Sequence, residues 1–448
     1  MMMNSSRRAV GVAVFFCSLL VFGQSPAPQK YILETKIGAD VGSLASRYRF
    51  TIGRSWRSDN HDSYAIAVGE WFGASDARVL AREPGVLEVE VDAAVRFGSE
   101  TSLLGGTALE RLTEQLRPRA PVGYFGSLVR ASYVDQPAAR IIGLPQSWSE
   151  FPTGAGVVAI IDTGVDERHP ALVNVLLPGY DFTRNLAGTA SELADLDQST
   201  VAILDQSTVA ILDGKVHPVK LNQSTVAILD QSTVAILDGR LPAAFGHGTM
   251  VAGLVHLTAP TAQILPLKAF RADGSSNVSD IVRAIYFAVD RGAAVITMSF
   301  SFDTPSVALS DAIAYAVKRG VICVASVGND GKEKRVYPAA FSRVIGVSST
   351  NYSDKRSPFS NYGEDSKASA PGEAVITTFP GNHYAGVWGT SFSTPMVAGA
   401  MAIMRQINPK MDAADAADLL EHGLKVRGDM GARLQLPAFL SECLGKKR

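Results

Sequence analysis

Residues 389–399, GTSFSTPMVAG, join a glycine-flanked turn to an apolar helical run that continues to Met404. Pro395 suits the first turn of a helix, because the N–H that proline lacks has no intrahelical partner there. Ser391 is therefore expected at or just before the helix N-terminus, where free N–H groups and the helix dipole favour an oxyanion. A serine in this position can act as a nucleophile, or it can simply cap the helix.

Two further segments supply partners for this serine. Residues 157–164, VVAIIDTG, form an apolar, β-branched run, so Asp162 is expected at the carboxyl end of a buried strand. Residues 246–253, GHGTMVAG, place His247 between glycines at the start of a second helix. Nucleophilic acyl transfer needs this set of side chains, because an imidazole must deprotonate the serine hydroxyl and a buried carboxylate must hold the imidazole in one tautomer.

Together and in this order, the three segments resemble the motifs of the subtilisin-like serine peptidases, the subtilase family or peptidase family S8. The resemblance runs from about residue 135 to near the end of the chain, with one interruption. It implies an α/β fold of three layers, in which helices flank a mainly parallel central sheet. It also implies a serine endopeptidase that uses Asp162, His247 and Ser391 as catalytic residues, forms an acyl-enzyme intermediate and requires no cofactor for the chemistry.

Downstream of His247, helical and apolar segments alternate. Residues 279–289 and 310–317 have helical patterns that Arg-Gly pairs close, and each is followed by an apolar run. This order indicates helices packed on a buried parallel sheet, which usually binds ligands at the carboxyl ends of its strands. Asn329 lies at such an end, in the segment VGNDG at 327–331. The resemblance assigns its carboxamide to an oxyanion hole, although asparagine is also an ordinary turn residue.

A second set of residues is predicted to bind substrate. The segment MSFSF at 298–302 resembles the edge strand that pairs with an extended peptide, but Ser301 and Phe302 replace glycines that are common in the family. Side chains at these positions would narrow or reshape the pocket for the residue before the scissile bond. Polypeptides bound by backbone pairing are the expected substrates. The predicted substrate-binding residues are Ser299, Phe300, Ser301 and Gly328.

Residues 1–23 resemble a secretory signal peptide. Two arginines precede an apolar run from Ala9 to Phe22, which is shorter than the ~20 residues that a membrane-spanning helix usually needs. Cleavage before Gln24 would release a secreted, extracytoplasmic protein with no membrane span. An uncleaved N-terminal anchor is the alternative.

Residues 24–97 alternate short strands and helices. The order of these patterns is compatible with a small ferredoxin-like α+β unit. It resembles the inhibitory propeptide of subtilases, of the inhibitor I9 type, which assists folding and then blocks the active-site cleft. The chain would then be a self-processing zymogen with its own propeptide as an intramolecular inhibitor. An ordinary small binding domain is the alternative.

The predicted peptidase domain covers residues 135–442 and follows a connector at 98–134. An insert at about 191–242 interrupts it with near-identical octapeptides of the type DQSTVAIL, the first of which begins at Asp197. An eight-residue period matches no solenoid repeat. Asp-Gly pairs within the insert are compatible with a hairpin added to the surface, and no chemistry is assigned to it.

Charge, a possible calcium site and two competing functions remain to be considered. The formal net charge of −1 and the pI near 6.7 give no electrostatic case for nucleic-acid binding. The resemblance allows for structural calcium, because Asp166 resembles part of a family calcium site, but residues 169–172 lack the expected acidic residue. Two functions compete with an endopeptidase: a secreted binding or scaffold protein with an occluded cleft, and an esterase with the same nucleophile.

Overall fold

The computed structural model describes residues 29–69, 71–96, 120–196 and 241–445, and the backbone of three short strands at 101–103, 220–222 and 226–229. The predicted signal peptide and most of the octapeptide insert lie outside the described residues. Within the described part, no helix combines the length and the apolar character needed to cross a membrane.

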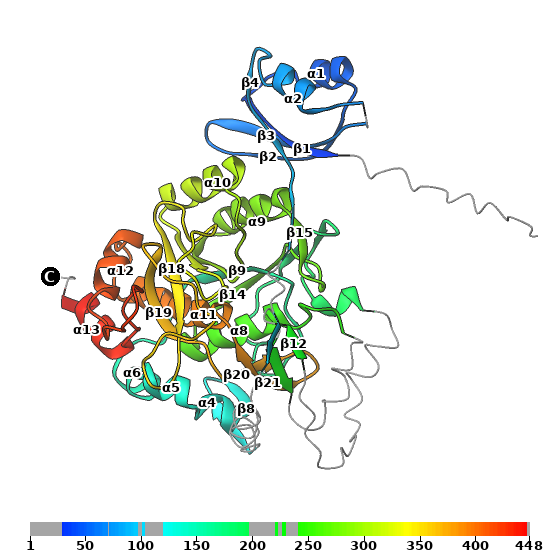
Figure 1. Ribbon diagram of the computed structural model, residues 1–448. Coiled ribbons are helices and arrows are strands. Elements are labelled where there is room, and N and C mark those ends of the chain that lie inside the picture. The colour runs from blue at the N-terminus through cyan, green and yellow to red at the C-terminus, as the bar shows by residue number, and fades with distance from the viewer. Residues whose placement is uncertain are drawn as a thin grey trace, which may run out of the picture.

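The larger unit is built around an eight-stranded sheet with the strand order β11-β10-β14-β9-β16-β17-β18-β19 (Figure 1). Every pairing is parallel except that of β10 with β11. The strands are β9 (Val157–Asp162), β10 (Tyr180–Asp181), β11 (Leu186–Ala187), β14 (Gln263–Lys268), β16 (Ala293–Met298), β17 (Ile322–Ser326), β18 (Val344–Thr350) and β19 (Ser366–Pro371).

Helices cover both faces of this sheet (Figure 1). Val158 and Ile160 of β9 pack in one core with α8 (His247–Thr258) and α11 (Thr390–Ile407). Ala159 and Ile161 point the other way and pack with α9 (Val278–Asp290) and α10 (Val307–Lys318). Alternate residues of one strand thus enter two separate cores, which is why the strand is apolar throughout. The predicted three-layer α/β fold is confirmed.

Peripheral elements complete the larger unit. Residues 120–134, assigned above to the connector, pack into it, and the hydroxyl of Tyr124 donates to the carbonyl oxygen of Leu257 in α8 at 2.7 Å. These elements are β7 (Pro121–Tyr124), β8 (Ser127–Arg130), α4 (Ala131–Val134), α5 (Pro137–Ile141), α6 (Leu144–Glu150), the 3₁₀ helix η1 (Glu192–Asp195), β20 (Val375–Phe379), β21 (His383–Trp388), α12 (Ala413–Leu420) and α13 (Leu436–Gly445).

The described part of the insert contributes two strands. β13 (Val226–Leu229), from the third octapeptide, pairs antiparallel with β21 and extends the β20–β21 hairpin to three strands. β12 (Lys220–Asn222) pairs with β6 (Thr101–Leu103). A repeat strand therefore joins the larger unit at the hairpin that directly precedes α11.

The smaller unit is a four-stranded antiparallel sheet in the order β2-β3-β1-β4. This is the order of a ferredoxin-like unit, as predicted. Figure 1 shows it above α9 and α10, with its sheet nearer to them than its own helices. Its elements are β1 (Lys30–Lys36), α1 (Val41–Tyr48), β2 (Thr51–Arg57), β3 (His61–Ala67), α2 (Ala74–Leu80) and β4 (Val86–Val91).

The smaller unit has its own core and also contacts the larger one. Tyr31 and Leu33 of β1 pack against α1 and α2. Ile32, between them, is fully buried in the core that contains α9 and α10. Beyond β4, β5 (Ala94–Arg96) pairs antiparallel with β15 (Ser275–Asn277) of the larger unit. The sheet of the smaller unit thus lies against the two helices through one face of β1.

Candidate active site

Two predicted site residues lie at the ends of neighbouring elements. β9 ends at Asp162, and α8 begins at His247. The imidazole Nδ1 lies 2.8 Å and 3.0 Å from the two carboxylate oxygens of Asp162, so Nδ1 donates its proton to the carboxylate. Both side chains are 1% exposed. This hydrogen bond selects the tautomer whose Nε2 can accept a proton.

Two glycines allow the close approach of these residues. A Cβ on Gly248 would lie 2.0 Å from the carbonyl oxygen of Gly164, so the first turn of α8 meets the turn after β9 backbone against backbone. Gly246, just before the histidine, has φ +86°, where other residues are strained. Glycine is therefore required at position 248 by the close backbone contact and favoured at position 246 by the positive φ.

Ser391 is the second residue of α11 and is 9% exposed. Its hydroxyl donates to the carbonyl oxygen of Ser299 at 2.9 Å, and the hydroxyl of Ser299 donates to the carbonyl oxygen of Ser391 at 2.9 Å. Ser299 follows the last residue of β16. A predicted substrate-binding residue thus contacts the predicted nucleophile from the carboxyl end of a central strand.

The prediction for Pro395 is wrong in one respect. α11 begins at Thr390, so Pro395 lies inside the helix and not in its first turn. A proline there cannot donate to the carbonyl four residues earlier, which is that of Ser391. The Ser299 hydroxyl supplies the missing donor, and the helix therefore continues through the proline with this carbonyl satisfied.

Packing of α8 against α11 brings the imidazole near the serine. The rings of His247 and Phe392 lie 5.4 Å apart between centroids, and Phe392 is the residue after Ser391. The two helices belong to the same core. The histidine and the serine thus sit at adjoining helix N-termini on one side of the sheet.

Asn329 lies beside the start of α11. Its carboxamide oxygen accepts hydrogen bonds from the backbone N–H of Thr390 at 2.9 Å and from the Thr390 hydroxyl at 3.0 Å. The amide nitrogen faces Gly389, where a Cβ would lie 3.6 Å from Nδ2. Two donors of Thr390 thus fix the carboxamide oxygen. The amide nitrogen of Asn329 therefore lies on the side of Gly389, two residues before Ser391.

The other predicted substrate-binding residues differ in what they offer. Phe300 is 2% exposed and packs 4.8 Å from the ring of Phe270 in the core, so contact with a peptide would use its backbone. A Cβ on Gly328 would lie 2.7 Å from Asn361 and 3.2 Å from the hydroxyl of Ser301. Gly328 is therefore required sterically, and Ser301 lies against it.

Glu192 is a site residue that no sequence motif indicated. This residue lies in the stretch assigned to the insert, yet it is fully buried in the larger unit. Its carboxylate accepts from the hydroxyl of Thr163 at 3.0 Å, from the N–H of Gly246 at 2.8 Å and from the hydroxyl of Thr249. Burial raises the pKa of Glu192 to about 8, whereas the threonine hydroxyls act in the opposite direction. The Glu192 side chain thus connects the turn after Asp162 to the first turn of α8, which carries His247.

Loss of this carboxylate is expected to destabilise the site. In Glu192→Ala, three buried donors would lose their acceptor, which we expect to lower the free energy of unfolding by about 3 kcal/mol or more. Glu192→Gln keeps one acceptor oxygen and should cost less. Urea unfolding of both variants measures the difference, and equal stability of Glu192→Ala and the wild type would contradict the role assigned to Glu192.

The residues around Asp166 do not fit a calcium ion. Its carboxylate oxygens accept hydrogen bonds from the backbone N–H groups of Arg168 at 3.0 Å and Gly381 at 2.9 Å. The nearby His169 is also buried and bonded to backbone, through Nδ1 to Ala171 at 3.2 Å. Calcium takes six to eight oxygen ligands, whereas both oxygens of this carboxylate already accept hydrogen bonds from backbone N–H groups. Asp166 is therefore a structural residue here.

Sequence comparison places the chain among known proteins. The model of the family described as "Subtilase family" matches residues 154–435, more than half of the chain. The chain belongs to the subtilase family. Catalysis in this family requires no cofactor.

Three relatives illustrate the similarity to known proteins. The chain is 33% identical over 257 residues to the thermophilic serine proteinase of Bacillus sp. (strain AK1), covering 55% of this chain and 51% of that protein. It is 31% identical over 263 residues to thermitase of Thermoactinomyces vulgaris, covering 59% and 79%. It is 38% identical over 173 residues to subtilisin Savinase of Lederbergia lenta, covering 37% and 64%. The matches thus span about half of the first relative and under two thirds of Savinase.

A solved structure shares the fold. The crystal structure of fervidolysin from Fervidobacterium pennivorans, described as a keratinolytic enzyme related to subtilisin, superposes with a TM-score of 0.67. The sequence identity is 19%, and the match covers 92% of this chain and 61% of that one. Because it covers 92% of the chain, this likeness in fold extends well beyond the residues that the family model matches.

Proposed function

We propose that the protein is a secreted serine endopeptidase, made as a self-processing zymogen. The observation that carries the proposal is the buried hydrogen bond from His247 to Asp162, next to a helix that begins at Thr390 and has Ser391 as its second residue. A carboxylate, an imidazole and a hydroxyl in this order are the elements of acyl transfer. Membership of the subtilase family and similarity to a relative named a serine proteinase support it.

In the proposed reaction, Nε2 of His247 accepts the proton of Ser391 while the serine oxygen attacks the peptide carbonyl. Asp162 stabilises the imidazolium that forms. The imidazolium then protonates the leaving amine, and water attacks the acyl-enzyme in the same way. The N-terminus of α11 favours the negative charge that develops on the carbonyl oxygen.

Asn329 is expected to donate to that oxyanion. Thr390 holds its carboxamide oxygen, so the N–H groups are the ones left for the substrate. Asn329→Ala should therefore lower kcat by roughly a hundred- to a thousandfold with little change in KM. Steady-state hydrolysis of a chromogenic peptide measures both constants. An unchanged kcat would remove Asn329 from the oxyanion hole.

The smaller unit is proposed to be the inhibitory propeptide. β5 adds to β15 of the larger unit by antiparallel pairing, as an extended peptide adds to the edge of a strand. Two carboxylates of the smaller unit also cap helices of the larger one. Glu90 accepts from the N–H of Val307 at 2.9 Å, at the start of α10, and Asp92 accepts from the N–H of Ser279 at 2.9 Å, at the start of α9. Processing would follow close after Arg96.

Intact mass spectrometry tests the proposal. The exported wild type and its Ser391→Ala variant are expressed side by side, and both are treated with a serine-directed fluorophosphonate. Loss of the N-terminal segment in the wild type only, with labelling at Ser391, is the expected result. Two folded chains that neither shorten nor react would favour a binding or scaffold protein whose cleft is occluded by the repeat insert or by the uncleaved smaller unit. A marked preference for esters over peptides would favour an esterase.

A further inference from the structure

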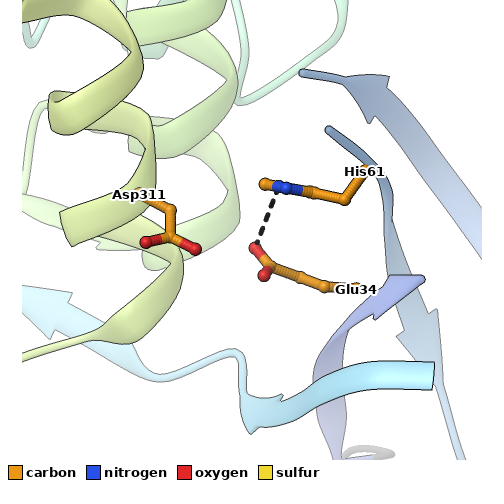
Figure 2. A group of neighbouring side chains, drawn as sticks. All are labelled: Glu34, His61 and Asp311. Atoms are coloured by element: carbon orange, nitrogen blue, oxygen red, sulfur yellow. Dashed lines mark ion pairs between the residues drawn. The ribbon is translucent and has the colours of Figure 1, made fainter. Parts of the chain in front are cut away.

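The contact between the two units contains a group of potential metal ligands. Figure 2 shows His61 of β3 and Glu34 of β1 reaching from the smaller unit toward Asp311 of α10. One ligand atom from each side chain lies within 4.8 Å of the others. Glu34 follows the buried Ile32 at the spacing that places both on the same face of β1. The three side chains therefore meet where the sheet rests on the helices.

The imidazole of His61 is prepared to bind a cation. The residue is 9% exposed, and its Nε2 atom is buried without a hydrogen-bond partner. This atom lies 3.6 Å from Oε1 of Glu34. The other ring nitrogen, Nδ1, lies 2.9 Å from the hydroxyl of Ser58, which orients the ring as outer partners of metal-bound histidines do. A buried nitrogen without a partner otherwise costs free energy.

Negative charge gathers around this nitrogen. Burial and the charges of Asp311, Glu90 and Glu88 raise the pKa of Glu34 to about 7. Glu88 lies directly opposite Glu34 in the pairing of β1 with β4, where like charges repel. Among the described residues, no lysine or arginine forms an ion pair with Glu34 or Asp311. A bound cation would neutralise these carboxylates and occupy the free nitrogen.

The donor set selects the kind of cation. One imidazole nitrogen and two carboxylate oxygens suit zinc, which binds them at about 2.0–2.2 Å, whereas calcium and magnesium take oxygen ligands. The 3.6 Å between Nε2 of His61 and Oε1 of Glu34 is close to the spacing of two ligands around one tetrahedral ion. Asp311, the most accessible of the three, offers its carboxylate oxygen within 4.8 Å of the other two ligand atoms.

We propose that Glu34, His61 and Asp311 bind one zinc ion that bridges the smaller unit to α10 and holds it on the larger unit. Binding itself is independent of catalysis. The consequence for activation rests on the proposed function: after cleavage near Arg96, zinc would delay release of the smaller unit and so delay the appearance of activity. Removal of zinc would then allow the smaller unit to dissociate.

Zinc binding is tested in the full Ser391→Ala chain, in which both units stay linked. Calorimetric titration with zinc chloride should give one equivalent per chain. Adding Asp311→Asn or His61→Gln should weaken binding by at least about tenfold to a hundredfold. His422→Gln is the matched control, because His422 forms an exposed pair with Glu442 at 2.7 Å, and it should change nothing. Thermal unfolding without metal checks that each variant is folded.

The proposed latch, in which zinc holds the smaller unit on the larger unit after cleavage, is tested separately in processed wild-type protein. Size-exclusion chromatography should show the two units together in zinc and apart after chelation, whereas Asp311→Asn should separate under both conditions. Absence of saturable zinc binding, or binding that Asp311→Asn leaves unchanged, overturns the site. Equal separation with and without zinc overturns the latch. A chain that binds zinc but never cleaves peptides retains the site and refutes only the peptidase proposal.

Discussion

Replacement of Ser391 by alanine is expected to lower turnover of a peptide substrate by roughly a million-fold, the magnitude seen when such a triad loses its nucleophile. Without the hydroxyl, His247 has no proton to accept and no acyl-enzyme can form. The smaller unit must first be removed from both chains, because it would mask any remaining activity. A trace of wild-type protein can cleave the variant and then be inactivated with a fluorophosphonate, which finds no nucleophilic serine to label in the variant.

Ser393→Ala provides the matched control for this variant. Ser393 lies two residues further along α11, is fully buried and donates its hydroxyl to the carbonyl oxygen of Ala370 at 2.9 Å. Its loss should cost about 1 kcal/mol of stability and leave turnover within about tenfold of the wild type. Near-normal hydrolysis by Ser391→Ala would exclude Ser391 as the nucleophile. A loss of similar size in both variants would show damage to the helix instead.

The central strands β9, β16 and β17 could be predicted because each is a mainly apolar run. β9 is buried on both faces, so its composition alone distinguishes it from a strand that faces water. Residues 120–134 gave no such signal. They are held by specific contacts with α8, such as the hydroxyl of Tyr133 on the carbonyl oxygen of Gly253 at 2.5 Å. A hydrogen bond between residues this far apart in the chain leaves no periodic pattern.

Within the candidate site, motifs indicated the residues that react but not those that support them. Glu192 precedes the first octapeptide and reads as part of a surface insert, yet its three donors come from the turn after β9 and the start of α8. The position of Pro395 in the helix also depends on a contact with a distant residue, which the local sequence does not reveal. Local preference predicts the first turn, whereas the Ser299 hydroxyl allows the proline further inside.

Asp162→Asn is expected to lower kcat by roughly ten-thousandfold with the fold retained. The carboxylate accepts from Nδ1 of His247 and from the N–H of Thr163 at 2.7 Å. An asparagine that keeps the bond from Thr163 with its oxygen puts its NH₂ group at the position of Oδ2, 3.0 Å from Nδ1, so a donor replaces one of the two acceptors there. The imidazole would adopt the tautomer with its proton on Nε2, and it could no longer accept the proton of Ser391.

Asp166→Asn separates this effect from the general cost of changing a buried carboxylate. Asp166 is 2% exposed and accepts only from backbone N–H groups in the contacts described above, those of Arg168 and Gly381. Its amide variant should lose stability but keep kcat within about tenfold, since no imidazole tautomer depends on it. Fluorophosphonate labelling gives an independent measure, because it also needs the base: the rate should fall in Asp162→Asn and not in Asp166→Asn. Equal labelling rates in the two variants would mean that Asp162 does not set the state of His247.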